Sequence, residues 1–155
     1  MVEDERLSDD PRALPPEVFD FVVNNELKRA IRSQNFLTLL IVEPSSRTTE
    51  GQRPELAREL ARVIGRVVRE TDILSPSTDG RLSLVLLDAD FDSSMQVVDR
   101  LMTWVEHYEF RTPATFAIGA ASCPTHGVDL ATLRSAAAAR TVQPRRAPRG
   151  SSNAQ

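Results

Sequence analysis

"DILSPSTDGRLSLVLL", residues 72–87, has the pattern of two short strands joined by a tight turn. Leu and Val dominate residues 81–87, which predicts a buried strand. The Ser-Pro-Ser-Thr-Asp-Gly stretch before it is rich in turn-forming residues, so we expect 72–74 to pair with that strand as a hairpin. Charged residues at and around the turn raise a second question, which is whether the hairpin carries chemistry.

The sequence on both sides of this hairpin alternates between helix and strand patterns. Two further strands are predicted at FLTLLIVE, 36–43, a nearly continuous apolar run stopped by Pro44, and at ATFAIGAASC, 114–123. Apolar residues recur at helical spacing over 17–33, about 55–70, 92–108 and 129–140, the last with Asp129 as its cap. The order helix-strand-helix-hairpin-helix-strand-helix predicts an α/β fold in which helices pack on a central sheet.

Length and composition favour a single domain. The chain has 155 residues, of which 41% are hydrophobic, and we place the domain at 17–140. Residues 1–16 and 141–155 are polar and lack a periodic apolar face, so we expect a disordered N-terminal linker and a disordered C-terminal tail.

The charge balance and the residue content favour a cytoplasmic location. A formal net charge of −3 gives no bulk electrostatic argument for binding nucleic acid or a membrane, so neither is expected as a partner. The single cysteine, Cys123, excludes an internal disulfide, and no apolar stretch reaches the roughly 20 residues of a membrane span.

Three segments resemble GGDEF domains. TFAIGAASCPTHGVDLATLRSAAAAR, 115–140, is similar to the C-terminal third of that family, with its Ser-Ile-Gly-Val-Ala strand and Pro-x-x-Gly turn. FLTLLIVEPS, 36–45, aligns without a gap with the strand that ends in Asp-x-Asp in the family, and DILSPSTDGRLSLVLLDAD, 72–90, aligns with the hairpin that carries the name motif. The resemblance covers about 17–140. It implies a fold like the palm of nucleotidyl cyclases, an α+β arrangement with a mostly antiparallel central sheet flanked by helices.

The residues that carry catalysis in the family are replaced in this chain. Where the family has Gly-Gly-Asp/Glu-Glu-Phe, the chain has Thr78, Asp79, Gly80, Arg81 and Leu82. The fourth residue of the motif, an acid that helps to hold metal ions, is thus a permanent cation.

The first strand has also lost one of its two metal-binding acids. Glu43 and Ser45 stand where the family has its two Asp residues, and one carboxylate facing an arginine is a poor magnesium site. The stretch between Glu43 and Arg69 is shorter than in the family and lacks the residues that read guanine. We therefore expect no diguanylate cyclase activity, no catalytic residue, no metal and no cofactor. We also expect Glu43 and Arg81 to form an ion pair in place of the metal.

One binding motif of the family is retained. Arg69 and Asp72 have the spacing of the Arg-x-x-Asp pair that captures the product c-di-GMP, and Arg100 falls near the position of a second arginine. The pair alone has no specificity, because Arg6 and Asp9 repeat it near the N-terminus. Arg69 and Asp72 could equally cap the preceding helix and pair with each other.

Two hypotheses about function follow from the resemblance. The first is an inactive signalling domain that binds c-di-GMP through Arg69, Asp72 and Arg100. The second is a nucleotide-independent module for protein–protein interaction or dimerisation that kept only the fold. Trp104 and Tyr108, on one predicted helix, are interpreted as core and rim residues because no basic groove surrounds them.

Overall fold

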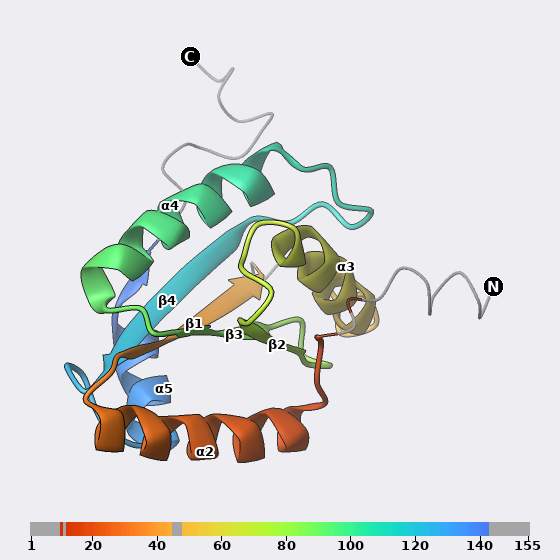
Figure 1. The fold of residues 1–155 in the computed structure, drawn as a ribbon. Helices are drawn as coiled ribbons and strands as arrows, with labels where there is room; N and C mark the ends of the chain where they lie inside the picture. Colours follow the sequence, from red (N-terminus) through yellow and green to blue (C-terminus); the bar gives the residue numbers. More distant parts are fainter. Residues whose placement is uncertain (1–9, 11, 45–47, 143–155) are drawn as a thin grey trace.

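The structure, a computed structural model, is a three-layer arrangement of helices on both faces of one antiparallel sheet (Figure 1). It describes residues 10, 12–44 and 48–142, so Ser45 lies outside the described residues. The described helices are α2 (Pro16–Ser33), α3 (Arg53–Gly65), α4 (Phe91–His107) and α5 (Leu130–Ala139). The strands are β1 (Leu37–Pro44), β2 (Ile73–Pro76), β3 (Leu82–Leu87), β4 (Phe116–Cys123) and β5 (Thr141–Val142).

The sheet has the order β2-β3-β1-β4-β5, and every pair of neighbouring strands is antiparallel. The predicted hairpin is confirmed as β2 and β3, with Leu74 opposite Leu84. Strand β1 lies at the centre, and Leu39 pairs with Val85 on one side and Ala121 on the other. This arrangement places the end of β1 beside the start of β3, so Glu43 and Arg81 come from neighbouring strand ends.

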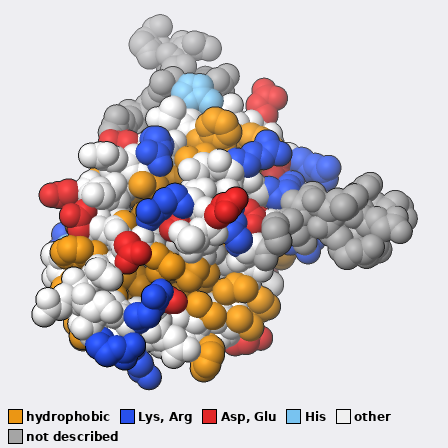
Figure 2. Space-filling model, viewed as in Figure 1, with side chains coloured by type: hydrophobic (Ala, Val, Ile, Leu, Met, Phe, Trp, Pro, Cys, Tyr) orange, Lys and Arg blue, Asp and Glu red, His pale blue; other side chains and the backbone are white. Residues whose placement is uncertain are grey.

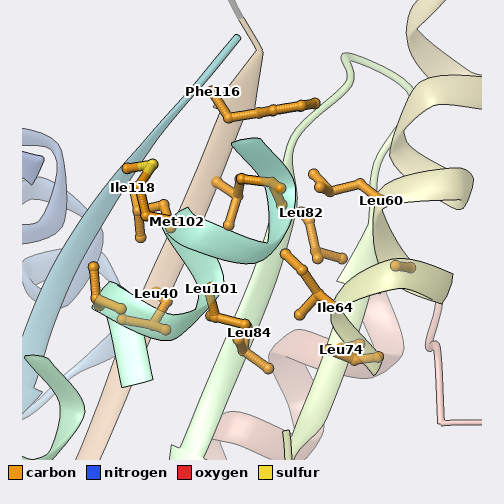
Figure 3. Packing of buried hydrophobic residues seen from close by; sticks show 14 of the residues in the cluster. Leu40, Leu60, Ile64, Leu74, Leu82, Leu84, Leu101, Met102, Phe116 and Ile118 are labelled. Atoms are coloured by element: carbon orange, nitrogen blue, oxygen red, sulfur yellow. The ribbon is translucent and has the colours of Figure 1, made fainter. Parts of the chain in front are cut away.

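Both faces of the sheet are covered, which explains why the sequence of β1 is apolar almost throughout. Side chains alternate between the faces along a strand. Leu40 and Val42 join the core under α3 and α4, whereas Leu37 and Leu39 join the core over α2 and α5. In Figure 3, Leu60 and Ile64 of α3 and Leu101 and Met102 of α4 meet strand residues in the first of these cores.

Helix α3 ends earlier than the periodicity predicts. The pattern indicates a helix to about residue 70, but α3 ends at Gly65. A further helical turn would need the Arg69 N–H to bond the Gly65 carbonyl. Instead, Asp72 Oδ2 accepts the Arg69 N–H at 3.0 Å, and Arg12 Nη2 donates to the Gly65 carbonyl at 2.5 Å. The side chains of Asp72 and Arg12 thus bond the N–H and the carbonyl that would have formed the next hydrogen bond of the helix.

Ordered contacts also extend beyond the expected boundaries at 17 and 140. Ala13 forms a parallel bridge with Leu74, and the Leu14 N–H donates to the Leu74 carbonyl at 2.9 Å. These residues cover part of the free edge of β2, although the sequence places them in a linker. At the other end, Thr141 and Val142 form β5 against β4, where the sequence analysis begins the tail.

Candidate functional site at the β2–β3 hairpin

The turn of the hairpin is built from local hydrogen bonds around one glycine. Gly80 adopts φ +91°, a backbone conformation that favours glycine, and its N–H donates to the Ser77 carbonyl at 3.1 Å. Asp79 accepts from the Arg81 N–H at 3.1 Å and from the Ser77 hydroxyl. Thr78 is exposed at the tip, and Leu82 is buried at the start of β3. These bonds account for most of the polar residues that made the turn resemble a reactive site.

The turn also packs closely against the end of β1 and the start of α3. A Cβ atom added at Gly80 would lie 3.0 Å from Pro44 Cγ and 3.2 Å from Arg53 Cβ. The Arg53 side chain donates in turn to the Thr48 hydroxyl at 3.2 Å. The glycine therefore allows close packing of the chain on itself at this point.

Arg81 lies between two carboxylates. Its Nε is 3.8 Å from Glu43 Oε2, which confirms the predicted pairing, and 3.8 Å from Asp79 Oδ2, a second partner that the sequence analysis missed. The side chains of Arg81 and Glu43 are 54% and 44% exposed, so each pair contributes under about 1 kcal/mol. Burial alone would raise the pKa of Asp79, but the Ser77 and Arg81 hydrogen bonds and the Arg81 charge hold it below its usual value.

This donor set does not fit a divalent metal ion. Magnesium is held by carboxylates together with phosphates and water, and a guanidinium between the carboxylates competes with the cation and repels it. Within residues 10, 12–44 and 48–142, no group of three or more His, Cys, Asp or Glu side chains is placed to hold a metal.

Arg69 and Asp72 are brought together, but with opposite exposure. Arg69 Nε lies 3.8 Å from Asp72 Oδ2, and their side chains are 61% and 2% exposed. Both carboxylate oxygens of Asp72 accept main-chain N–H groups, Oδ2 from Arg69 at 3.0 Å and Oδ1 from Leu87 at 3.3 Å. Burial raises the pKa of Asp72, and these bonds and nearby arginines offset only part of that effect. Asp72 thus ties the loop before β2 to the end of β3.

The arginines around Asp72 are also engaged with the main chain. Arg69 Nη2 donates to the Leu87 carbonyl at 2.7 Å, and Arg12 Nη1 donates to the Arg69 carbonyl at 2.5 Å. Arg100 is exposed on α4, and no hydrogen bond or ion pair of the described residues joins it to Arg69 or Asp72. The structure therefore brings two of the three candidate ligand residues together.

A cavity of about 260 Å³ opens beside the hairpin on the side of α2 and α5. Its lining includes Glu43, Asp79 and Arg81 at one side and the Asp20–Arg134 ion pair, 2.6 Å long, between the helices. These charged groups pair with each other. Sequence reasoning missed the cavity because Asp20 and Arg134 are 114 positions apart and share no motif.

Solved structures show which fold this is. A DGC protein from Thermotoga maritima matches with a TM-score of 0.71 at 15% identity, over 86% of this chain and 100% of that one. The GGDEF domain of DgcB from Caulobacter crescentus in complex with c-di-GMP matches with a TM-score of 0.66 at 13% identity, over 86% of this chain and 84% of that one. The diguanylate cyclase SiaD in complex with its activator SiaC from Pseudomonas aeruginosa matches with a TM-score of 0.67 at 16% identity, over 90% of this chain and 58% of that one. The chain has the GGDEF-domain fold.

At 13–16% sequence identity, these matches show that the chain shares the fold of GGDEF domains and nothing beyond the fold. No protein-family model and no curated protein sequence matches the chain. The α+β class and the antiparallel sheet predicted from the resemblance are confirmed. Among the described helices of this GGDEF fold, none is long and apolar enough to cross a membrane.

Proposed function

We propose that this chain is a catalytically inactive GGDEF-like signalling domain that acts through contacts with proteins. The observation that supports inactivity is the position of Arg81, 3.8 Å from both Glu43 and Asp79. Transfer of a nucleotidyl group from a triphosphate requires neutralisation of negative charge and activation of a hydroxyl, which metal ions supply. Here the carboxylates already pair with a permanent side-chain cation, and among the described residues no group of three or more His, Cys, Asp or Glu side chains could hold the metal.

The packing of the turn supports the same proposal. In GGDEF domains the glycines of the motif let the backbone approach the nucleotide. In this chain the one glycine of the turn lies against Pro44 and Arg53 instead. We infer a cytoplasmic location for this domain, because a single cysteine excludes an internal disulfide and fits a reducing compartment.

Incubation of the purified chain with GTP and either Mg²⁺ or Mn²⁺ tests the proposal. We expect no c-di-GMP by chromatography and mass spectrometry. The matched controls are Glu43→Ala and Arg81→Ala, which should behave as the wild type. Product that forms with the wild type and disappears in Glu43→Ala would show that the site is active.

A role as a c-di-GMP receptor is the second candidate. It is favoured by Arg69, whose exposed guanidinium lies beside Asp72 at the spacing of the family's ligand pair, and by the c-di-GMP complex of a protein with the same fold. The burial of Asp72 disfavours it, since the side chain is only 2% exposed and both of its oxygens already accept main-chain N–H groups. The nucleotide-independent interaction module is therefore the better-supported function.

Calorimetric titration with c-di-GMP separates the two candidates. Binding that weakens by at least about tenfold in Arg69→Ala, the loss of a hydrogen bond to a charged group, would establish the receptor. The matched control is Arg66→Ala, an exposed arginine three positions earlier. We expect no heat of binding with the wild type.

A further inference from the structure

The chain has one tryptophan and one tyrosine, and both are exposed at the C-terminal end of α4. Trp104 lies in the last turn of α4 (Phe91–His107), Tyr108 is the C-cap residue that follows the helix, and their exposed fractions are 45% and 38%. Amphipathic aromatic side chains are usually covered in part, and they are enriched at protein interfaces. The interpretation of these residues as core and rim does not explain their exposure.

Arg100 completes a row along this helix. Arg100 and Trp104 are four positions apart on one stripe of α4, and Tyr108 follows four positions later as the C-cap residue, so the three span about 12 Å along the helix axis. All three are exposed, and they are the three residue types that dominate binding energy at interfaces. We call these three residues the α4 row.

One end of the α4 row is held in place by the core. The Tyr108 ring meets the Phe110 ring edge to face at 4.7 Å, and Phe110 lies 5.1 Å from the buried Phe116. A side chain that is already fixed loses less conformational entropy when a partner covers it. The α4 row is thus partly organised for binding.

We propose that the α4 row binds the same row of a second copy of this chain, with the two α4 helices antiparallel. The order of the three residues in the row favours a second copy as the partner. In a two-fold contact centred on Trp104, its ring meets the ring of its counterpart, and Arg100 of each copy faces Tyr108 of the other. Cation–aromatic and aromatic–aromatic pairs are both favourable, so the row is complementary to itself.

The size of this surface predicts a weak dimer. A standard interface buries about 800 Å² on each partner, and one helical stripe provides less. Self-association in the micromolar range follows. The inference rests on the proposed function, because it identifies the partner through which an inactive domain acts.

A different exposed apolar surface provides the matched control. Figure 2 shows hydrophobic side chains gathered over α2 and the neighbouring sheet edge, and Phe21 and Val18 of α2 are both exposed. Apart from its apolar character, nothing in that surface specifies a partner. Phe21→Ala therefore removes an exposed aromatic ring without touching the α4 row.

Sedimentation and fluorescence of the full chain test the dimer without any nucleotide. We expect reversible dimers as the concentration rises from micromolar to submillimolar, with a shift of Trp104 emission to shorter wavelength. Trp104→Ala, followed by sedimentation, should raise the dissociation constant at least about 30-fold, as loss of a hot-spot residue does. Phe21→Ala should change it less than about threefold, a difference too small for a hot spot. Circular dichroism checks folding, and Arg100→Ala and Tyr108→Ala repeat the test if Trp104→Ala unfolds.

Mixing two variants tests the antiparallel register. Arg100→Ala and Tyr108→Ala each break both cross-pairs in their own dimer, but a mixed dimer regains one intact pair. The mixture should therefore dimerise more strongly than either variant alone. A monomeric wild type, dimerisation that is lost only in Phe21→Ala, or no gain on mixing would each overturn the proposal. A monomeric wild type would refute the dimer but would say nothing about cyclase activity, which the GTP assay measures separately. Failure of the dimer proposal and failure of the proposed function are therefore distinguishable.

Discussion

Replacement of Asp72 by Ala should destabilise the domain strongly if this carboxylate is a structural anchor. The change leaves the N–H groups of Arg69 and Leu87 without their acceptor at a site where the Asp72 side chain is only 2% exposed. An unsatisfied buried donor costs about 1–3 kcal/mol, so we expect a loss of about 2–4 kcal/mol in the free energy of unfolding. That is a large share of the roughly 5–15 kcal/mol of an ordinary domain.

Urea unfolding followed by circular dichroism measures this loss as a lower midpoint at an unchanged slope. Arg69→Ala is the matched control. It removes an exposed side chain with one bond to the Leu87 carbonyl and a 3.8 Å ion pair, so we expect a loss of about 1 kcal/mol or less. If Asp72→Ala costs no more than Arg69→Ala, the anchor role is refuted and Asp72 is free to serve a ligand.

Three further perturbations test the surroundings of the site. Gly80→Ala should cost about 1–3 kcal/mol in urea unfolding, because Gly80 has φ +91° and a Cβ would lie 3.0 Å from Pro44 Cγ; a neutral variant would contradict the close packing of the turn. Arg12→Ala removes two bonds to main-chain carbonyls and should cost about 1.5–3 kcal/mol by the same measurement, whereas no loss would show that residues 12–14 do not hold the domain. The pKa of Asp129 is lowered by the Thr132 N–H that it accepts, so its contribution to stability is present above its usual value of 3.8 and is lost as the pH falls through the lowered pKa. Asp129→Asn should therefore flatten the loss of stability on acidification, and an unchanged pH profile would contradict this.

Local sequence patterns were enough to predict the main elements. Alternation and turn chemistry located the β2–β3 hairpin, and the continuous apolar run identified β1 as a strand covered on both faces. The Glu43–Arg81 pair also followed, because both residues lie at strand ends whose pairing the hairpin and the family resemblance fix.

Contacts between distant residues could not be read from these patterns. The end of α3 depends on Arg12, which is 53 positions from Gly65, and on an acid that lies beyond the periodic stretch. The sequence suggested Asp72 as a ligand residue because the Arg-x-x-Asp motif specifies the spacing of the two residues but does not show that the Asp72 side chain is buried. Its two main-chain bonds, one of them to Leu87, appear only when β2 and β3 are paired. Long-range packing therefore set both the helix boundary and the role of the motif residue.

Titration of the chain with Mn²⁺ in the presence of GTP, read by electron paramagnetic resonance, tests most directly whether Arg81 has taken the place of a metal. The account predicts that the wild type binds no Mn²⁺ beyond that bound by GTP. It also predicts that Arg81→Glu gains a site, since this change replaces the cation between Glu43 and Asp79 with a third carboxylate. Mn²⁺ bound by the wild type and released in Glu43→Ala would contradict the account.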